Sequence, residues 1–196
     1  LIVNNVDSID SMKPEVAYSL INTSQKTIRA YAIRQDFTTA NSKFTASDCQ
    51  VIRSSNSFLQ PGQTTPGSIG NSGSNEPIIS ITLTVDVVEF DDGEFWGKNT
   101  TNSRDLIDGM HYGIRKAVDF YQQKRKQALL EGIATNLEQD IVIALPTQEN
   151  KSKEWIKGYQ SGVTSVQARL SQAYKKYGID ELGHELNRAI SEIEKR

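Results

Sequence analysis

The clearest strand in the sequence is "IISITLTVDVVEF", residues 78–90. Its apolar side chains alternate with polar ones, and successive side chains of a strand point to opposite faces of a sheet. One predicted face carries Ile79, Ile81, Leu83, Val85 and Val87. The apolar phase shifts at Val87-Val88, which indicates a β-bulge or a strand end that is covered on both faces.

Shorter strand patterns precede this one at residues 16–22, 28–37 and 42–52, and Pro61-Gly62 marks a turn. Because no helical pattern interrupts them, residues 1–101 are predicted to form an antiparallel β-sandwich. The stretch 64–77 is almost wholly Gly, Ser, Asn, Thr and Pro. It is predicted to be a long mobile loop, either a binding loop or a tolerated insertion.

From residue 102 the apolar spacing changes to that of α-helices. The first helical stripe comprises Leu106, Ile107, Met110, Ile114, Ala117, Val118 and Tyr121. A second helix is predicted over 151–177, with Gly178 as its C-cap. Its apolar stripe comprises Trp155, Ile156, Tyr159, Val163, Val166, Leu170, Ala173, Tyr174 and Tyr177. A third helix is predicted over 180–194, with Leu182, Leu186, Ala189, Ile190 and Ile193. Residues 137–145 fit a short helix or a strand. The predicted fold class is therefore α+β, with a sandwich domain (1–101) before a helical region (102–196) of two or three long helices.

Composition excludes several classes of protein. The chain of 196 residues is 37% hydrophobic and has a net charge of −2. Residues 1–102 carry 7 basic and 11 acidic residues, and residues 103–196 carry 15 and 13. Neither part is polycationic, which argues against nucleic-acid binding. No apolar run approaches the roughly 20 residues that a membrane helix needs.

Cysteine usage and the first residue bear on the compartment. Cys49 is the single cysteine, so a disulfide framework and a cysteine-based zinc site are excluded. We expect it to be a small buried hydrophobic residue rather than a reactive thiol. The sequence begins at Leu1 rather than at methionine, from which we expect a mature or trimmed form of an exported protein.

The strand at 78–90 runs into an acidic stretch, "DDGEFWG", residues 91–97. Asp and Gly favour the backbone angles of tight turns, so Asp91, Asp92, Gly93 and Glu94 predict a hairpin turn. Trp96 is then expected to lie in the return strand and to be buried against the sheet. The alternative is a Ca²⁺ or sugar site that combines the three carboxylates with an aromatic platform, although the spacing of a calcium loop is absent.

Three turns in the first half of the chain carry a resemblance. They are an N-x-S-type turn in "VAYSLINTSQKTIRAYAI" (16–33), the Pro-Gly turn of "FLQPGQT" (58–64), and a closing hairpin with Asp92, Gly93, Trp96 and Gly97. Residues 15–113 resemble a group of exported bacterial proteins with an immunoglobulin-like β-sandwich, most of them uncharacterised. The resemblance implies a fold and a compartment, not an activity. The two cysteines of antibody-type domains are missing.

The histidines offer only weak metal-binding patterns. His111 follows Asp108 on a predicted helix, and His184 follows Asp180 and Glu181. Such neighbours are ordinary on solvated helix faces. The sequence has no HExxH motif, nucleophile elbow, Walker loop or dinucleotide fingerprint. N-x-S/T sequons, a pattern that is common by chance, begin at Asn22, Asn99 and Asn150.

These observations predict a non-catalytic extracytoplasmic binding or structural module (secreted, periplasmic or in the cell envelope). We expect no catalytic, cofactor-binding or metal-binding residues, no cofactor, no nucleic-acid partner and no membrane span. The helices are the expected interaction element, through a protein partner or self-association, because their apolar stripes must be covered. The alternative is a carbohydrate- or peptide-acting enzyme or accessory domain that uses the acidic hairpin 91–94. It would need two carboxylates about 5–10 Å apart across a cleft.

Overall fold

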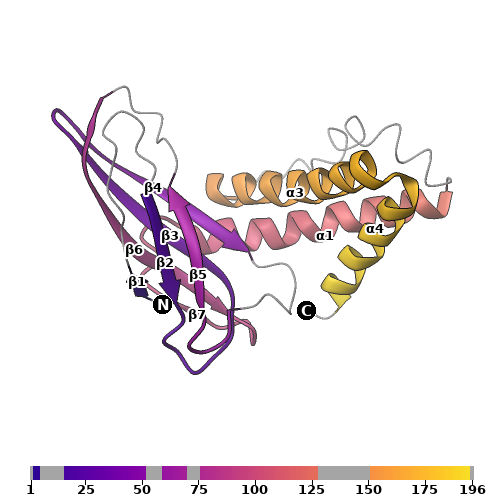
Figure 1. The fold of residues 1–196 in the computed structure, drawn as a ribbon, viewed down its shortest axis with the longest axis horizontal. Helices are drawn as coiled ribbons and strands as arrows, with labels where there is room; N and C mark the ends of the chain where they lie inside the picture. The colour runs from indigo at the N-terminus through magenta and orange to yellow at the C-terminus, as the bar shows by residue number, and fades with distance from the viewer. Residues whose placement is uncertain (1, 5–15, 52–58, 70–75, 128–150, 195–196) are drawn as a thin grey trace. The chain divides into compact units, whose positions relative to one another are not determined.

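The computed structural model describes residues 2–4, 16–51, 59–69, 76–127 and 151–194. The chain forms two compact units, Leu1–Ser103 and Arg104–Arg196. The first is built of β-strands and the second of α-helices (Figure 1). The predicted α+β class, with antiparallel sheets before C-terminal helices, is therefore confirmed. The stretch 137–145 lies outside the described residues.

The β unit contains two antiparallel sheets. Its described strands are β1 (Ile2–Asn4), β2 (Val16–Ile21), β3 (Ile28–Thr39), β4 (Lys43–Val51), β5 (Thr64–Ile69), β6 (Ile78–Phe90) and β7 (Phe95–Trp96). One sheet has the order β1-β2-β5 and the other β4-β3-β6-β7. The patterns at 16–22, 28–37, 42–52 and 78–90 thus correspond to β2, β3, β4 and β6.

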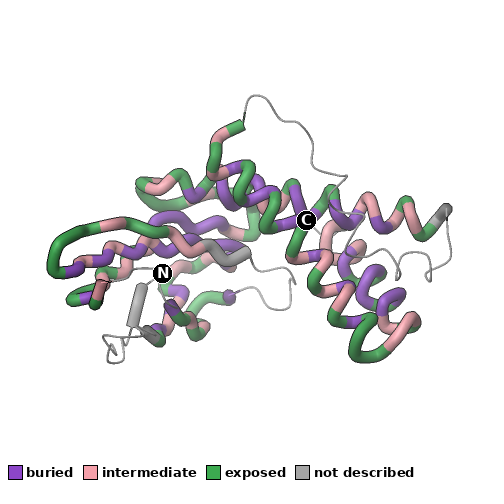
Figure 2. The backbone as a smooth tube through the Cα atoms, turned by 90° about the horizontal axis from the view of Figure 1, so that it is seen from above, coloured by how far each residue is buried: buried purple, intermediate pink, exposed green. Residues whose placement is uncertain are grey.

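Both sheets contribute side chains to one hydrophobic core. The cluster comprises Tyr18, Leu20, Ile28, Tyr31, Ile33, Phe37, Leu59, Ile69, Ile78 and Val88. Tyr18 and Leu20 come from the first sheet, whereas Ile33 and Val88 come from the second. Buried residues accordingly recur along the strands (Figure 2). The two sheets therefore bury their apolar faces against a shared core.

Two irregularities change the predicted faces of β6. A register shift between Val85 and Val87 leaves Asp86 without a partner on β3, and every residue from Asp86 to Glu89 is buried. The predicted phase shift is thus real but begins before Val87. A second shift falls at Ile79, which is 64% exposed. The prediction that Ile79 shares the core-facing side was wrong because it assumed an unbroken register.

The prediction of a loop over 64–77 was wrong for its first part. Thr64–Ile69 forms β5, the edge strand that pairs with β2. Tyr18 lies opposite Gly67, and its ring occupies the space that a Cβ at Gly67 would fill. Pairing and this contact outweigh the low strand propensity of the residues. An edge strand also tolerates Pro66. Residues 70–75 lie outside the described chain.

The helical unit contains α1 (Ser103–Gln127), α3 (Lys153–Tyr177) and α4 (Ile179–Glu194). The Ser152 side chain caps α3 by accepting a hydrogen bond from the N–H of Trp155 at 3.1 Å. Gly178, with φ +81°, ends the helix as predicted, and its N–H donates to the oxygen of Tyr174 at 2.8 Å. None of the described helices combines the length and the hydropathy that a membrane span requires.

Glycines bring α1 and α3 into backbone contact. A Cβ at Gly109 would overlap the backbone oxygen of Trp155, and one at Gly158 would overlap that of Leu106. Gly113 and Gly162 repeat this relation further along both helices. The two helices therefore run in the same direction, joined by small residues spaced as in G-x-x-x-G motifs. Most of the predicted stripe of α3 is buried, but Ile156, Tyr174 and Tyr177 are exposed.

Candidate functional site

The acidic stretch after β6 folds as a tight turn. Gly93 has a φ of +85°, which glycine adopts without strain. The N–H of Phe90 donates to the oxygen of Glu94 at 2.9 Å, and the N–H of Gly93 donates to the oxygen of Phe90 at 3.0 Å. β7 then pairs with β6 as the return strand. The predicted hairpin turn at 91–94 is confirmed.

Two acids of this turn bind the same lysine. Lys26 Nζ lies 2.7 Å from Asp92 Oδ2 and 2.5 Å from Glu94 Oε2. It also lies 5.5 Å from the centroid of the Phe90 ring. The hydrogen bond from Lys26 is the main reason that the pKa of Asp92 lies below its usual value. Because the three charged groups are largely exposed, these ion pairs add little to stability.

Asn22 organises the turn between β2 and β3. Its fully buried Nδ2 donates to the backbone oxygens of Lys26 and Leu59, at 2.9 and 2.8 Å. Its Oδ1 accepts hydrogen bonds from the N–H and the hydroxyl of Ser24, at 3.0 and 2.7 Å. The amide therefore has partners for both hydrogens and both lone pairs. In the folded chain, this sequon serves as a structural motif.

The three turns that carry the resemblance meet at one end of the β unit. The N–H of Gly62 donates to the oxygen of Asn22 at 2.8 Å, and the N–H of Asn22 donates to the oxygen of Gln63 at 2.9 Å. The N–H of Asp91 donates to the oxygen of Thr27 at 3.0 Å. Backbone hydrogen bonds thus join segments that are far apart in the sequence. We call this region the three-turn end: residues 22–27, 60–63 and 91–94.

Trp96 is not buried, which corrects the sequence prediction: its exposed fraction is 58%. It pairs with Val88 across β6 and β7 and forms part of a pocket of about 270 Å³ beside the three-turn end. The other lining residues are Thr23, Ser24, Ile28, Val88 and Phe90. Ile28 and Val88 are themselves buried in the core, so the core is filled without the indole.

Asp86, at the bulge of β6, holds the segment that follows Trp96. Its Oδ1 accepts from the N–H and hydroxyl of Thr100 at 2.7 and 2.8 Å, and its Oδ2 accepts from those of Thr101 at 3.1 and 2.7 Å. Burial opposes the charged form, but the hydrogen bonds from Thr101 and Thr100 outweigh it and lower the pKa of Asp86. Gly97, with φ +121°, packs directly on the Asp86 backbone. The backbone is therefore fixed on both sides of Trp96.

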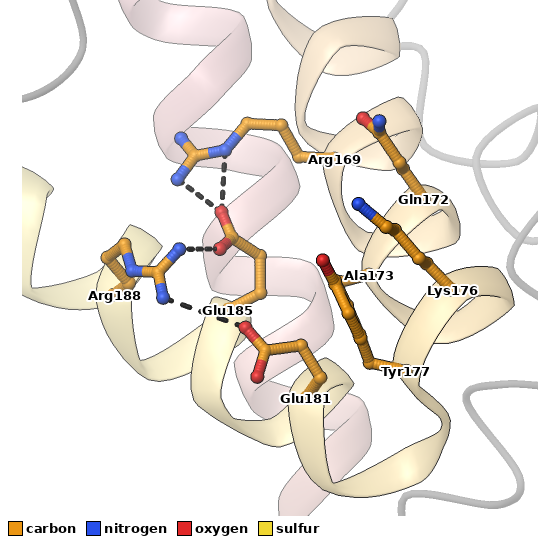
Figure 3. Close-up of a pocket in the computed structure, with 8 residues that line it drawn as sticks. All are labelled: Arg169, Gln172, Ala173, Lys176, Tyr177, Glu181, Glu185 and Arg188. Carbon is orange, nitrogen blue, oxygen red and sulfur yellow. Dashed lines mark hydrogen bonds and ion pairs between the residues drawn. The ribbon is translucent and has the colours of Figure 1, made fainter.

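A second candidate is an ion-pair cluster between α3 and α4 (Figure 3). Glu185 is buried and is bound by Arg169 and Arg188. Arg169 Nη1 also lies 3.0 Å from Glu192 Oε2, and Arg188 Nη2 lies 3.7 Å from Glu181 Oε1. The adjoining pocket, of about 220 Å³, is lined by Arg169, Gln172, Ala173, Lys176, Tyr177, Glu181, Glu185 and Arg188.

The charges of this cluster satisfy one another. One oxygen of Glu185 accepts from Arg169 and the other from Arg188. Burial would lower the pKa of Arg169, but Glu192 and Glu185 raise it above its usual value. Removing one partner would leave a buried charge uncompensated. The cluster therefore serves to hold α4 on α3.

The remaining residues singled out in the sequence do not gather into a site. His111 is half-buried on α1, and His184 is exposed on α4. Within the described ranges, no group of three or more His, Cys, Asp or Glu residues is placed to hold a metal ion. The side chain of Cys49 and the whole of Asn150 lie outside the described residues.

The sequence did not predict that Thr23, Ser24 and Lys26 belong to a site. Lys26 lies 66 positions from Asp92 and 68 from Glu94, its ion-pair partners. The presence of a lysine in one turn and acids in another does not predict an ion pair between them. No local pattern links turns at such separations.

Comparisons with known proteins add little to this description. No protein-family model and no curated protein matches the chain. A solved structure of a hypothetical protein from Peptoclostridium difficile 630 is similar at 13% sequence identity, over 52% of this chain and 88% of that chain, with a TM-score of 0.36. A TM-score this low carries no argument, so any functional conclusion depends on the site itself.

Proposed function

We propose that the protein is a non-catalytic binding module whose ligand-binding surface is the three-turn end with the Trp96 pocket. The observation that carries the proposal is the exposed indole of Trp96 on a backbone that is fixed on both sides. Ligand sites are typically preformed, mostly apolar hollows with a few polar groups. A rigid aromatic side chain adds contact area at little entropic cost.

The arrangement of the acids supports binding rather than catalysis. A glycosidase needs a carboxylic acid whose raised pKa lets it protonate the leaving group. Lys26 instead lowers the pKa of Asp92. Asp92 and Glu94 are both bound to the same ammonium group and exposed to solvent. These features favour a non-catalytic role for the acidic hairpin over the role of an enzyme active site.

The finer fold and the compartment belong to the same proposal. We infer an immunoglobulin-like sandwich, which is supported by two antiparallel sheets with a shared core. We also propose that the protein acts outside the cytoplasm, as its resemblance to exported proteins implies. Fractionation of the source cells tests the compartment: recovery in the cytoplasm alone would refute it.

A second interaction surface is proposed on α3, where Ile156, Tyr174 and Tyr177 are exposed. The rest of the predicted stripe is covered within the helical unit, so these residues are the candidate contacts for self-association. Sedimentation of the full chain over a range of concentrations tests this proposal. A dimer that Tyr177→Ser weakens supports it, and a monomer at all concentrations contradicts it.

Protein-observed NMR of the isotope-labelled chain, titrated with a library of small fragments of mixed chemistry, tests the binding surface. We expect the fragments that bind to shift the amide signals of Thr23, Ser24 and Trp96, and to remain chemically unchanged on long incubation. Binding that gathers elsewhere, or turnover of a fragment that Asp92→Asn abolishes, would contradict the proposal.

A further inference from the structure

We infer that the Trp96 pocket binds one neutral sugar ring of a glycan, an inference that rests on the proposed function of the three-turn end. The pocket volume of about 270 Å³ lies just below the range of about 300–1,000 Å³ for drug-sized ligands. It therefore suits a single ring. Because Trp96 is exposed, the rest of a glycan can continue into solvent.

The pocket lining has an apolar part and a part with hydroxyl groups, and so does a sugar ring. Trp96 and the half-buried Phe90 offer apolar surface, the buried core residues Ile28 and Val88 complete the lining, and Thr23 and Ser24 carry hydroxyl groups. A sugar ring has C–H groups on its faces and hydroxyl groups around its edge. The face of an aromatic ring is electrostatically negative and attracts polarised C–H groups. The Ser24 hydroxyl already donates within the turn and accepts from the N–H of Lys26. Trp96 can thus stack on the ring face while the Thr23 hydroxyl binds its edge.

The charges near the pocket favour a neutral ligand. None of the lining residues is charged. Lys26, which lies over the Phe90 ring, is already paired with Asp92 and Glu94. An ionic ligand would lose water without gaining a free counter-charge. Sugar hydroxyls, in contrast, both donate and accept, so they can hydrogen-bond to the ammonium and carboxylate groups without disturbing their charge balance.

A protein partner fits this end of the molecule less well. Stable protein interfaces bury roughly 800 Å² on each side. Among the described residues of the β unit, the large hydrophobic side chains that are exposed are Ile79 and Trp96. Ile79 lies near the start of β6, whereas Trp96 pairs near its end. They form no contiguous apolar patch, so a small ligand is the better match.

NMR titration of the full chain tests the inference. The chain has two tryptophans, so the indole signal of Trp96 reports on the pocket and that of Trp155, buried in the helical unit, serves as an internal control. The probes are neutral cello-, xylo-, manno-, malto- and N-acetylchito-oligosaccharides. Oligogalacturonate serves as an anionic probe and N-acetyl-leucinamide as an apolar side-chain probe. We expect at least one neutral oligosaccharide to shift the Trp96 signal saturably and to leave Trp155 unchanged.

Variants separate stacking from general effects on the fold. Trp96→Ala should weaken binding by about tenfold or more, whereas Trp96→Phe should retain part of it because an aromatic face remains. The matched control is Ile79→Ala, which removes a large hydrophobic side chain of the β unit with similar exposure, 64% against 58%. It should bind as the parent does. Unchanged amide spectra away from the pocket verify that the variants are folded.

The inference is overturned if no neutral oligosaccharide moves the Trp96 signal, or if oligogalacturonate or N-acetyl-leucinamide moves it at lower concentration. Equal binding by Trp96→Ala also overturns it. If other fragments bind the three-turn end and no sugar does, this inference fails while the proposed function stands. If nothing binds there, both fail.

Discussion

Replacement of Asp86 by asparagine tests how the segment after Trp96 is held. In the parent chain, the two carboxylate oxygens accept four hydrogen bonds, from Thr100 and Thr101. In the variant, the amide nitrogen replaces one oxygen and faces a hydroxyl and a backbone N–H. The hydroxyl can rotate and accept, but the backbone N–H cannot. One buried N–H is therefore left without a partner.

The magnitude follows from these four bonds. An unsatisfied buried N–H costs about 1–3 kcal/mol, and the remaining bonds lose the charge that makes them roughly twice as strong. We expect the free energy of unfolding of the β unit to fall by about 2–4 kcal/mol. Because the folded state lowers the pKa of Asp86 from its usual 3.8, this stabilisation is complete above that value. It is lost as pH falls through the lower, folded-state pKa. The difference in unfolding free energy between the parent and Asp86→Asn should therefore become smaller in strong acid.

Hydrogen exchange read by mass spectrometry across a urea series provides the assay, because peptides from β3 and β6 report on the β unit alone. With a urea dependence of about 2 kcal/mol per molar, the transition should move by about 1–2 M. The control is Asp91→Asn in the exposed turn, which should stay within about 0.5 kcal/mol of the parent. The reasoning would be refuted if Asp86→Asn moved the urea midpoint no more than the control does. It would also be refuted if the midpoint difference from the parent stayed the same in acid.

Three further predictions concern packing, hydrogen bonding and titration. Gly109→Ala should destabilise the helical unit by about 1–3 kcal/mol because its Cβ would overlap α3. In thermal unfolding followed by helical circular dichroism, Ser161→Ala, at an exposed position, should instead be near neutral. Asn22→Ala should cost the β unit about 2–4 kcal/mol because it removes the four hydrogen bonds that the side-chain amide makes to Lys26, Leu59 and Ser24; unchanged exchange in β2 and β3 would contradict this. Tyr18, compared with Tyr18→Phe by absorbance, should titrate with a pKa of about 12 because of burial, not at the usual 10.0.

Much of the secondary structure could be predicted because burial of one face imposes a period on the sequence. The alternation in residues 78–90 identified β6, and the helical stripes identified α1, α3 and α4. Local chemistry also sufficed for the turn at 91–94, where Gly93 supplies the positive φ. These features depend on residues that are close in the sequence.

Features that depend on distant partners could not be predicted. β5 forms because β2 pairs with it and the Tyr18 ring lies over Gly67, not because its own residues favour a strand. From the sequence alone, Gly109 and Gly158 are ordinary helix positions. Their role follows only from the backbone contacts between α1 and α3. The burial of Trp96 was inferred from its place in the return strand of the hairpin. Residues of β3 and β6 fill the core beneath it, and the sequence does not show this.

The exposure of Trp96 is the central claim, and acrylamide quenching of its fluorescence tests it most directly. The measurement uses the full chain with Trp155→Phe, so that Trp96 is the single emitter. With 58% of its surface exposed, Trp96 should be quenched at more than half the rate of the free analogue N-acetyl-tryptophanamide. Emission that resists acrylamide and shifts to the blue would show a buried indole, and it would contradict both the pocket and the binding surface built on it.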